Sequence, residues 1–292
     1  MLRINLTIIN KYIIHIEHAG DIVVKLKKVI KKDMNINKSE KPLLIAGPCS
    51  VESHQVMQET AVFLKKLGIE YIRGGAFKPR TSPYSFQGLG EQGLEILSQI
   101  KTCYGLKVVS EVLDVREIDM VCQVADIVQV GSRNMYNYSL LKELGRTGKT
   151  ILLKRGLSAT LDEWLGAAEY IALAGNDNII LCERGIRTFE PSTRNTMDLN
   201  AIPLIKQRTG LKVIADASHG TGVREIVNPM CMASVACGAD GLLTEIHPRP
   251  EEAMSDGFQS LNFEEYERLY GDVMGLYRYI RKTKNEESKS ML

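Results

Sequence analysis

Eight short apolar stretches rich in β-branched residues recur along this chain from Lys41 onward, and amphipathic helical segments separate them. Continuous apolar stretches of this length are typical of strands buried on both faces, as in a parallel sheet covered by helices. Eight such repeats favour an α/β fold of the (β/α)8 TIM-barrel class, and an open doubly wound sheet is the alternative. The predicted strands are 43–47, 71–75, 107–112, 126–131, 150–156, 178–185, 212–219 and 241–247.

Ionisable side chains gather at or just after the carboxyl ends of these stretches. In a (β/α)8 barrel all strands end at one mouth, and active sites are built there. Strand ends are often polar, but chance would place only one or two such groups there. The sequence therefore predicts an active site lined by Arg73, Glu111, Arg133, Lys154, Arg184, His219 and Glu245.

Composition narrows the class of protein. The chain has 292 residues, of which 44% are hydrophobic and 25% charged, so it can bury one large barrel core. No apolar run reaches the roughly 20 residues of a membrane span, and no secretory signal is visible, so a cytoplasmic location is expected. The six cysteines show no C-x-x-C spacing, which argues against a disulfide framework. A net charge of +2 argues against a general nucleic-acid binder.

Gly88, Gly90 and Gly93 form a literal G-x-G-x-x-G, the pattern of a dinucleotide-binding turn. That motif needs an apolar strand directly before it, whereas residues 78–87 are a polar segment that contains prolines. Glu111 does stand at nearly the distance of a ribose-binding acid. We nevertheless interpret the glycines as a loop that begins a helix, without a dinucleotide cofactor.

Six cations stand at the predicted mouth of the barrel. Together they could neutralise a phosphate and a carboxylate, through bidentate guanidinium contacts and the point charge of lysine. Each alone could equally be a surface or carboxylate-paired side chain, but burying them jointly without an anion would be costly. These residues are Arg73, Lys78, Arg80, Arg133, Lys154 and Arg184.

Four residues could donate to a metal ion. Cys49, His219, Glu245 and Asp256 follow the first, seventh and eighth predicted strands, which adjoin in a closed barrel. A thiolate, an imidazole and two carboxylates suit Zn²⁺, Fe²⁺, Mn²⁺ or Co²⁺ better than Ca²⁺ or Mg²⁺. The alternative from spacing alone is a buried free cysteine and an unrelated polar histidine.

Several longer motifs follow one another along the chain, namely LIAGPCSVES, RGGAFKPRTSPYSFQGLG, QVGSRNM, LLKRG, CERGIRTFE, DASHGTG, TEIHP and SDGFQS. Together they resemble the 3-deoxy-D-arabino-heptulosonate 7-phosphate (DAHP) synthases of the type I beta group. The resemblance covers Lys41 to about Arg281 and rests on the presence of these motifs in the same order. It implies a (β/α)8 barrel and a metal-dependent transferase that condenses phosphoenolpyruvate (PEP) with erythrose 4-phosphate at the entry to the shikimate pathway.

The resemblance also implies roles for individual residues. Cys49, His219, Glu245 and Asp256 match the ligands of a divalent metal. The PEP-binding cations correspond to Arg73, Lys78, Arg133, Lys154 and Arg184, and the site of the erythrose phosphate to Arg80, Thr81 and Ser82. We expect Lys78 to deliver a proton to the new alkoxide, Glu111 or Asp216 to handle the water, and His247 and Glu183 to support the site from behind.

Two other functions remain open from the sequence. The related synthases that use arabinose 5-phosphate to make 3-deoxy-octulosonate 8-phosphate typically carry an Asn-containing ANRTS loop, whereas this chain has Lys78-Pro79-Arg80. A non-catalytic barrel that docks a separate chorismate mutase would show damaged catalytic positions, and none is found. The erythrose 4-phosphate enzyme, expected to be a homotetramer, is therefore favoured.

Residues 1–40 form a separate segment before the predicted barrel of 41–292. They contain two or three short β-rich runs, which fit neither a complete ferredoxin-like regulatory domain nor a helical chorismate mutase domain. We predict a short N-terminal β-rich extension that covers one end of the barrel or helps assembly, on an enzyme without feedback inhibition by Tyr, Phe or chorismate.

Overall fold

The computed structural model describes residues 41–80 and 82–290. The predicted N-terminal extension and Thr81 lie outside the described residues. The hypotheses about feedback inhibition and about the role of the extension therefore stay predictions. Within the described part of the chain, no helix is both long enough and apolar enough to cross a bilayer.

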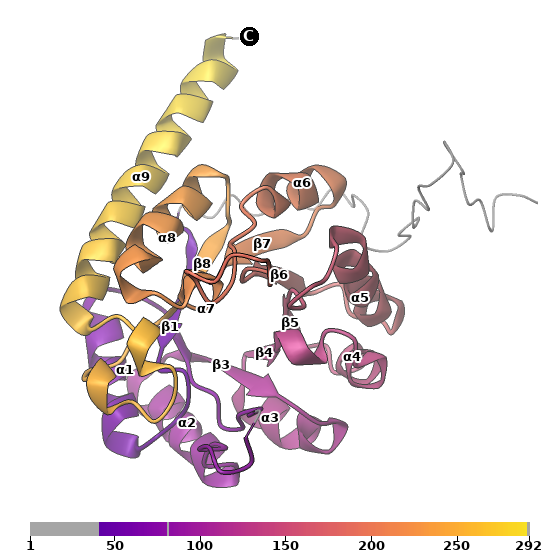
Figure 1. Cartoon of the computed structure of the whole chain (residues 1–292), viewed down its shortest axis with the longest axis vertical. Coiled ribbons are helices and arrows are strands. Elements are labelled where there is room, and N and C mark those ends of the chain that lie inside the picture. The colour runs from indigo at the N-terminus through magenta and orange to yellow at the C-terminus, as the bar shows by residue number, and fades with distance from the viewer. Residues whose placement is uncertain (1–40, 81, 291–292) are drawn as a thin grey trace, which may run out of the picture.

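Eight parallel strands close into a barrel in sequence order, with β8 paired to β1 (Figure 1). This confirms the predicted (β/α)8 class and excludes the open sheet. The predicted strand positions hold, but six of the eight strands are shorter than expected. The seventh differs most, because residues 217–221 form a helix. The strands are β1 Leu43–Gly47, β2 Tyr71–Arg73, β3 Lys107–Val112, β4 Ile127–Val130, β5 Thr150–Lys154, β6 Ile179–Glu183, β7 Lys212–Ala215 and β8 Gly241–Glu245.

Helices surround the barrel, and several begin with a side-chain cap that the sequence supplies. Ser53 caps the first helix, and Thr160 with Glu163 forms a capping box on the fifth. The last helix packs along its neighbour α8 and continues past the end of the barrel (Figure 1). The helices are α1 His54–Lys66, α2 Glu91–Tyr104, α3 Ile118–Val124, α4 Tyr138–Leu144, α5 Leu161–Leu173, α6 Ala201–Arg208, α7 Ala217–Thr221, α8 Val227–Ala236 and α9 Phe263–Ser290.

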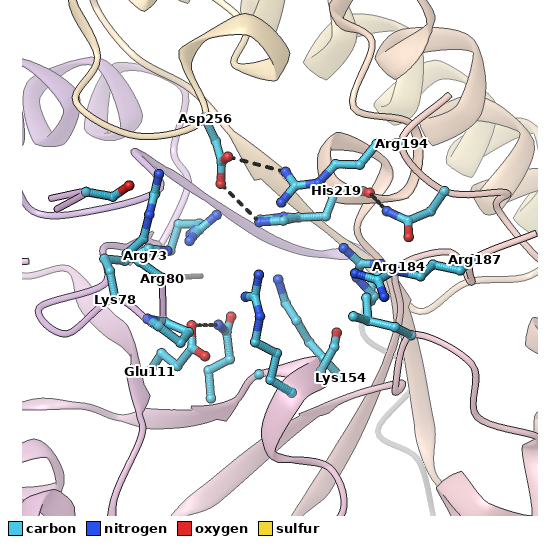
Figure 2. Close-up of a pocket in the computed structure, with 18 of the residues that line it drawn as sticks. Arg73, Lys78, Arg80, Glu111, Lys154, Arg184, Arg187, Arg194, His219 and Asp256 are labelled. Atoms are coloured by element: carbon cyan, nitrogen blue, oxygen red, sulfur yellow. Dashed lines mark hydrogen bonds and ion pairs between the residues drawn. The ribbon is translucent and has the colours of Figure 1, made fainter. Parts of the chain in front are cut away.

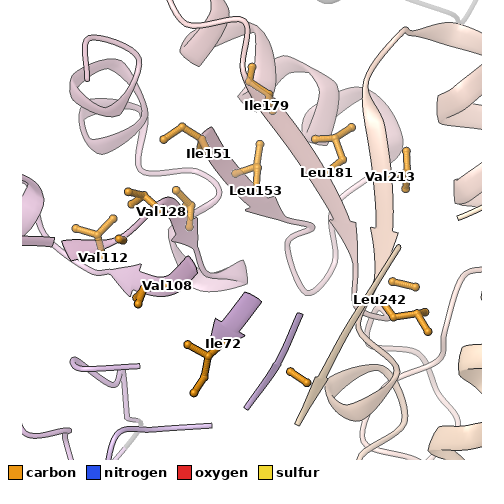
Figure 3. Packing of buried hydrophobic residues seen from close by; sticks show 14 of the residues in the cluster. Ile72, Val108, Val112, Val128, Ile151, Leu153, Ile179, Leu181, Val213 and Leu242 are labelled. Carbon is orange, nitrogen blue, oxygen red and sulfur yellow. The ribbon is translucent and has the colours of Figure 1, made fainter. Parts of the chain in front are cut away.

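Two layers of apolar side chains hold the strands. The larger layer lies between the strands and the helices and includes Ile72, Val108 and Leu181 (Figure 3). The smaller layer fills the inside of the barrel, so the interior is packed and leaves room for a site only at its mouth. This inner layer consists of Ile45, Val109, Ile127, Leu152, Ile180, Cys182, Ile214 and Leu243.

The G-x-G-x-x-G segment forms the loop and helix start that the sequence predicted. Gly90 is the N-cap of α2, and both Gly88 and Gly90 have positive φ. A Cβ atom on Gly88 would lie 2.1 Å from the carbonyl oxygen of Ala76, so only glycine allows this close approach. The loop is thus fixed against the segment that follows β2.

Replacing Gly88 with alanine should therefore destabilise the fold more than the same change at an open glycine. We expect a loss of about 3 kcal/mol in the free energy of unfolding, from backbone strain and steric overlap together. Gly105 also has positive φ but has nothing within 4 Å of the added carbon, so Gly105→Ala should cost only about 1 kcal/mol. Urea denaturation of both variants measures the difference, and equal losses would refute the close-approach explanation.

Candidate active site

The inner layer of the barrel determines which side chains enter the mouth. Successive residues of a strand point to opposite faces, so the residue two positions beyond an inward apolar side chain also points inward. At the carboxyl ends of seven strands that position is polar. The pairs are Tyr71 and Arg73, Val109 and Glu111, Ile127 and Gln129, Leu152 and Lys154, Cys182 and Arg184, Ile214 and Asp216, and Leu243 and Glu245.

These ends open into a cavity of about 370 Å³ with an excess of positive charge (Figure 2). Glu111 and Asp256 are the two carboxylates among its lining residues. The cations are Arg73, Lys78, Arg80, Arg133, Lys154, Arg184, Arg187 and Arg194, and Ser82 also lines the cavity. A small molecule with more than one anionic group would suit this cavity.

Two of the deep cations are neutralised by the protein itself. Arg73 Nη1 lies 2.6 Å from Glu245 Oε1, and Lys154 Nζ lies 2.5 Å from Asp216 Oδ2. All four of these side chains are buried. Each ion pair therefore links a cation of the cavity to a carboxylate that lies beside the His219 ring.

Arg184 is different, because it is only 4% exposed and makes no ion pair with any residue of 41–80 or 82–290. Its Nη1 donates to the carbonyl oxygen of Gly185 at 3.2 Å. Burial lowers the pKa of its guanidinium, and Asp216 opposes this only in part. A buried cation without a contacting anion is costly, so Arg184 indicates a place for an anionic ligand.

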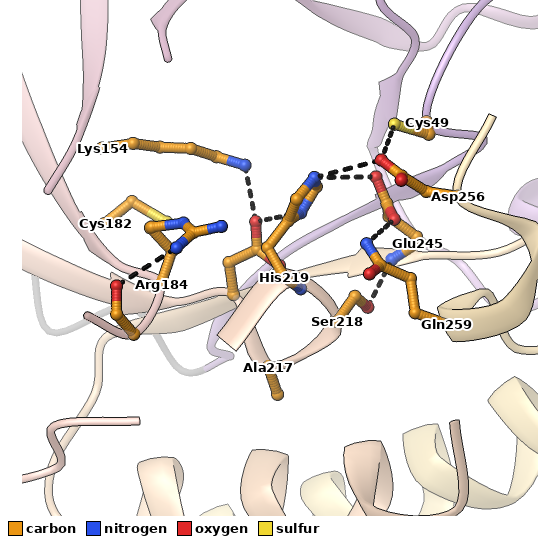
Figure 4. A network of polar contacts seen from close by, with 12 residues as sticks. Cys49, Lys154, Cys182, Arg184, Ala217, Ser218, His219, Glu245, Asp256 and Gln259 are labelled. Atoms are coloured by element: carbon orange, nitrogen blue, oxygen red, sulfur yellow. Dashed lines mark hydrogen bonds and ion pairs between the residues drawn. The ribbon is translucent and has the colours of Figure 1, made fainter. Parts of the chain in front are cut away.

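Cys49, His219, Glu245 and Asp256 lie together, as Figure 4 shows, and their donor atoms are all within 4.8 Å of one another. Cys49 Sγ lies 3.1 Å from Asp256 Oδ2, and His219 Nε2 lies 3.4 Å from Glu245 Oε1. The sequence prediction placed these four residues on one metal site, and the fold brings them together. His219 reaches it from α7, one turn beyond the strand on which it was expected.

Neighbouring residues orient two of these donors. Asp216 Oδ2 lies 2.8 Å from His219 Nδ1, and Asp216 Oδ1 accepts the backbone N–H of His219 at 3.0 Å. Glu245 is held by Arg73 on one oxygen and, on the other, by Gln259 Nε2 at 2.6 Å. A carboxylate behind a histidine and a donor on a ligand carboxylate are the arrangement that fixes ligands around a metal ion.

The protonation of the cluster fits a metal of the transition series. Burial favours neutral His219 and lowers its pKa, although Asp216 and Glu245 oppose this. Burial would raise the pKa of Glu245 and of Asp256, but Arg73 beside Glu245 and Arg194 beside Asp256 oppose burial, and the pKa of both carboxyls lies below its usual range. Burial and Glu245 raise the pKa of Cys49 to about 12. Two carboxylates, an imidazole and a thiol that a bound cation would deprotonate match the donors of Zn²⁺, Fe²⁺, Mn²⁺ or Co²⁺.

The other predicted residues fall in distinct places. Asp216 does not line the cavity but lies behind His219 and Lys154. Glu111 lines it and accepts a hydrogen bond from Gln129. Glu183 points outward and pairs with Arg155 at 2.9 Å. The predicted water handling by Glu111 or Asp216, the substrate contact of Asp216 and the supporting role of Glu183 stay predictions.

Sequence reasoning missed Arg187 and Arg194 in the segment between β6 and α6. Arg194 Nη1 lies 3.3 Å from Asp256 Oδ1 and 2.9 Å from Gln259 Oε1. The segment folds back through an antiparallel bridge between Ile186 and Thr196, which returns both arginines to the mouth. Arg187 stands only three residues after Arg184, and that spacing was the available signal.

Comparison with known proteins identifies the family. The profile of the DAHP synthetase I family matches residues 21–279. The chain belongs to the DAHP synthetase I family. The prediction of a DAHP synthase, made from the sequence motifs, is thereby confirmed.

Individual relatives agree with the family assignment. The chain is 52% identical over 233 residues to the phospho-2-dehydro-3-deoxyheptonate aldolase of Thermotoga maritima, which covers 80% of this chain and 69% of that protein. The crystal structure of the Thermotoga maritima DAHP synthase superposes with a TM-score of 0.84 at 45% identity, over 89% of this chain and 79% of that one. A 2-dehydro-3-deoxyphosphooctonate aldolase of Desulfosudis oleivorans is more distant, at 34% identity over 82% of this chain and 92% of that protein.

Proposed function

We propose that this DAHP synthase condenses PEP with erythrose 4-phosphate in the cationic cavity, beside a divalent metal held by Cys49, His219, Glu245 and Asp256. The proposal rests on one observation, that the cationic cavity and the four-donor cluster share residues. Asp256 and His219 line the cavity and also belong to the four-donor cluster. One substrate can therefore lie on the cations while the other reaches the metal.

The deep cations suit the phosphate and the carboxylate of PEP. Arg73, Lys78, Lys154 and Arg184 are each at most 8% exposed, so an anion placed among them is removed from bulk water. Contacts between charged groups are stronger in such surroundings than at the surface. Lys78 and Arg184 make no ion pair with a carboxylate of the described residues, so they supply positive charge that the protein leaves uncompensated. Arg133, at the exposed rim, would complete this group.

A metal bound to the four donors would polarise the aldehyde oxygen of the acceptor as a Lewis acid. The donor set admits Mn²⁺, Fe²⁺, Co²⁺ or Zn²⁺. His219 can offer Nε2 because Nδ1 is engaged by Asp216. Cys49 gives the site a soft donor, which disfavours Ca²⁺ and Mg²⁺.

Lys78 is the candidate proton donor. Its Nζ lies 3.0 Å from Cys49 Sγ and 3.2 Å from Cys49 O, so it stands next to the cluster and still lines the cavity. Burial opposes its charge, but Glu111 and the thiolate form of Cys49 outweigh burial and raise the pKa of Lys78, which keeps it protonated. We propose that it gives a proton to the acceptor oxygen as C3 of PEP bonds to the aldehyde carbon. Water then adds at C2 of the PEP moiety. Inorganic phosphate leaves when the bond between C2 and the phosphate ester oxygen breaks.

The acceptor phosphate would lie farther out. Arg80 and Ser82 line the outer part of the cavity, and Arg80 makes no ion pair with a described residue. Pro79 separates Lys78 from Arg80, so one short segment would contact both substrates. We place the erythrose phosphate at Arg80 and Ser82, together with Thr81. Assembly as a homotetramer and a cytoplasmic location stay predictions.

The choice of aldose tests this assignment. We expect release of phosphate from PEP with erythrose 4-phosphate to show a kcat/KM at least about 100-fold higher than with arabinose 5-phosphate, a difference of roughly 3 kcal/mol. Both reactions are assayed in parallel with the same enzyme and metal. An equal or higher kcat/KM with arabinose 5-phosphate would contradict the assignment and favour the octulosonate synthases.

A further inference from the structure

The four donors of the cluster lie on different kinds of element. Glu245 ends β8, and His219 lies on α7 with its backbone held by Asp216. Cys49 and Asp256, in contrast, lie on two loops, residues 48–53 after β1 and residues 246–262 after β8. A site that depends on loop residues needs contacts that hold those loops in place.

We propose that Glu52 is a positioning residue that joins these two loops and so sets the spacing between Cys49 and Asp256. The inference rests on the proposed metal function of the four-donor cluster. Glu52 itself contacts none of the four donors. It stands three residues after Cys49, and its partner on the other loop stands two residues before Asp256.

The contacts of Glu52 run to both parts of the second loop. Its Oε1 accepts the backbone N–H of Met254 at 2.9 Å, and its Oε2 lies 3.3 Å from His247 Nε2. The side chains of Glu52 and His247 are 6% and 2% exposed. Glu52 therefore contacts the loop both where it leaves β8 and where it approaches Asp256.

A second contact strengthens the same junction. The hydroxyl groups of Ser50 and Ser255 share a hydrogen bond, and both side chains are buried. Ser50 Oγ also donates to Glu52 Oε1 at 3.4 Å. Ser50 and Ser255 are the direct chain neighbours of Cys49 and Asp256, so this pair transmits the position of one ligand to the other.

The backbone at Asp256 shows why the loop must be held. Its φ is 51°, and among the described residues it is the one non-glycine residue with a positive φ. Left-handed backbone is unfavourable for such a residue and persists only where the surroundings enforce it. Ser260 Oγ donates to Asp256 O at 3.1 Å from within the loop, whereas Glu52 and Ser50 hold the loop from outside.

A nearby ion pair provides a matched control. Glu59 lies on α1 and pairs with Arg249 on the same second loop at 2.8 Å. This pair is about one third exposed, and neither residue contacts a chain neighbour of Cys49 or Asp256. The substitution Glu59→Ala therefore removes a carboxylate contact from the same loop without changing a residue next to Cys49 or Asp256.

The test measures binding of Co²⁺ alone to the metal-free enzyme, by competition with a chelator and by the thiolate-to-cobalt absorption that reports Cys49. We expect Glu52→Ala to weaken Co²⁺ binding about 10- to 100-fold, the usual effect of removing a group that supports a metal ligand. Glu52→Gln should lose less, because its amide oxygen can still accept the Met254 N–H. Glu59→Ala should bind Co²⁺ as the parent does, and melting temperatures of the metal-free proteins are measured alongside.

The possible results separate the two proposals. If the parent binds no Co²⁺, the proposed metal site is wrong and the role of Glu52 falls with it. If the parent binds Co²⁺ and Glu52→Ala binds it equally well, only the role of Glu52 is refuted. If Glu52→Ala does not fold, Glu52→Gln replaces it, and Co²⁺ binding by Glu52→Gln equal to that of the parent refutes the role of Glu52.

Discussion

Replacing Cys49 with alanine is expected to lower kcat by about 1,000-fold, or roughly 4 kcal/mol of transition-state stabilisation, while the fold is kept. The change removes the one sulfur from the four-donor cluster and with it the contact to Lys78 Nζ at 3.0 Å. It thus affects both the proposed metal site and the proposed proton donor. Steady-state kinetics with added Mn²⁺, together with a thermal melt, measure the effect.

The control for this change is Cys231→Ala on α8. Cys231 is also fully buried, but it belongs to the apolar layer outside the barrel and lies in neither the cluster nor the cavity. It should lose some stability through the deleted packing and retain its kcat. If Cys49→Ala kept full activity, or if Cys231→Ala lost as much, the assignment of Cys49 would be wrong.

Replacing Arg184 with methionine should separate substrate binding from stability. We expect kcat/KM for PEP to fall about 100- to 1,000-fold, or roughly 3–4 kcal/mol. The reason is that bound PEP would lose a buried cation that no protein carboxylate neutralises. The free energy of unfolding of the ligand-free enzyme should stay the same or rise, because the change removes a buried charge that lacks an ion pair. Kinetics with varied PEP and denaturation without substrate measure the two quantities.

Arg155 is a buried arginine whose replacement should have the opposite effect on stability. It is as buried as Arg184, but it points away from the mouth and pairs with Glu183 at 2.9 Å and Asp198 at 2.7 Å. Arg155→Met leaves the buried Glu183 carboxylate unpaired, which should cost about 3–5 kcal/mol of stability. If Arg184→Met destabilised the ligand-free enzyme as much as Arg155→Met, Arg184 would be a structural cation and the prediction would fail.

The barrel and most of its site could be predicted because strand periodicity links the two. An apolar inward position such as Leu152 or Cys182 fixes the direction of the residue two places later, here Lys154 or Arg184. The sequence alone does not show which residues of a buried strand point inward. In LLKRG two cations follow one another, and only one of them can point into the barrel mouth. Lys154 enters the cavity and Arg155 does not, although both cations stand at the end of the same run.

What could not be predicted lies in the loops. Arg187 and Arg194 reach the mouth only because their segment folds back on itself, and Glu52 acts through a loop far away in sequence. Local patterns carry no information about such long-range contacts, since loops lack the periodicity of strands and helices. His219 was placed on a strand because α7 begins only two residues after β7 ends.

The most direct test of the central claim is consumption of PEP in the presence of erythrose 4-phosphate, with and without a chelator. We predict steady loss of PEP absorbance with the metal-loaded enzyme, loss of that activity after chelation, and its return on adding Mn²⁺ or a similar ion. The return distinguishes metal removal from irreversible unfolding. Undiminished turnover in chelator, in a preparation shown to be free of metal, would contradict the account.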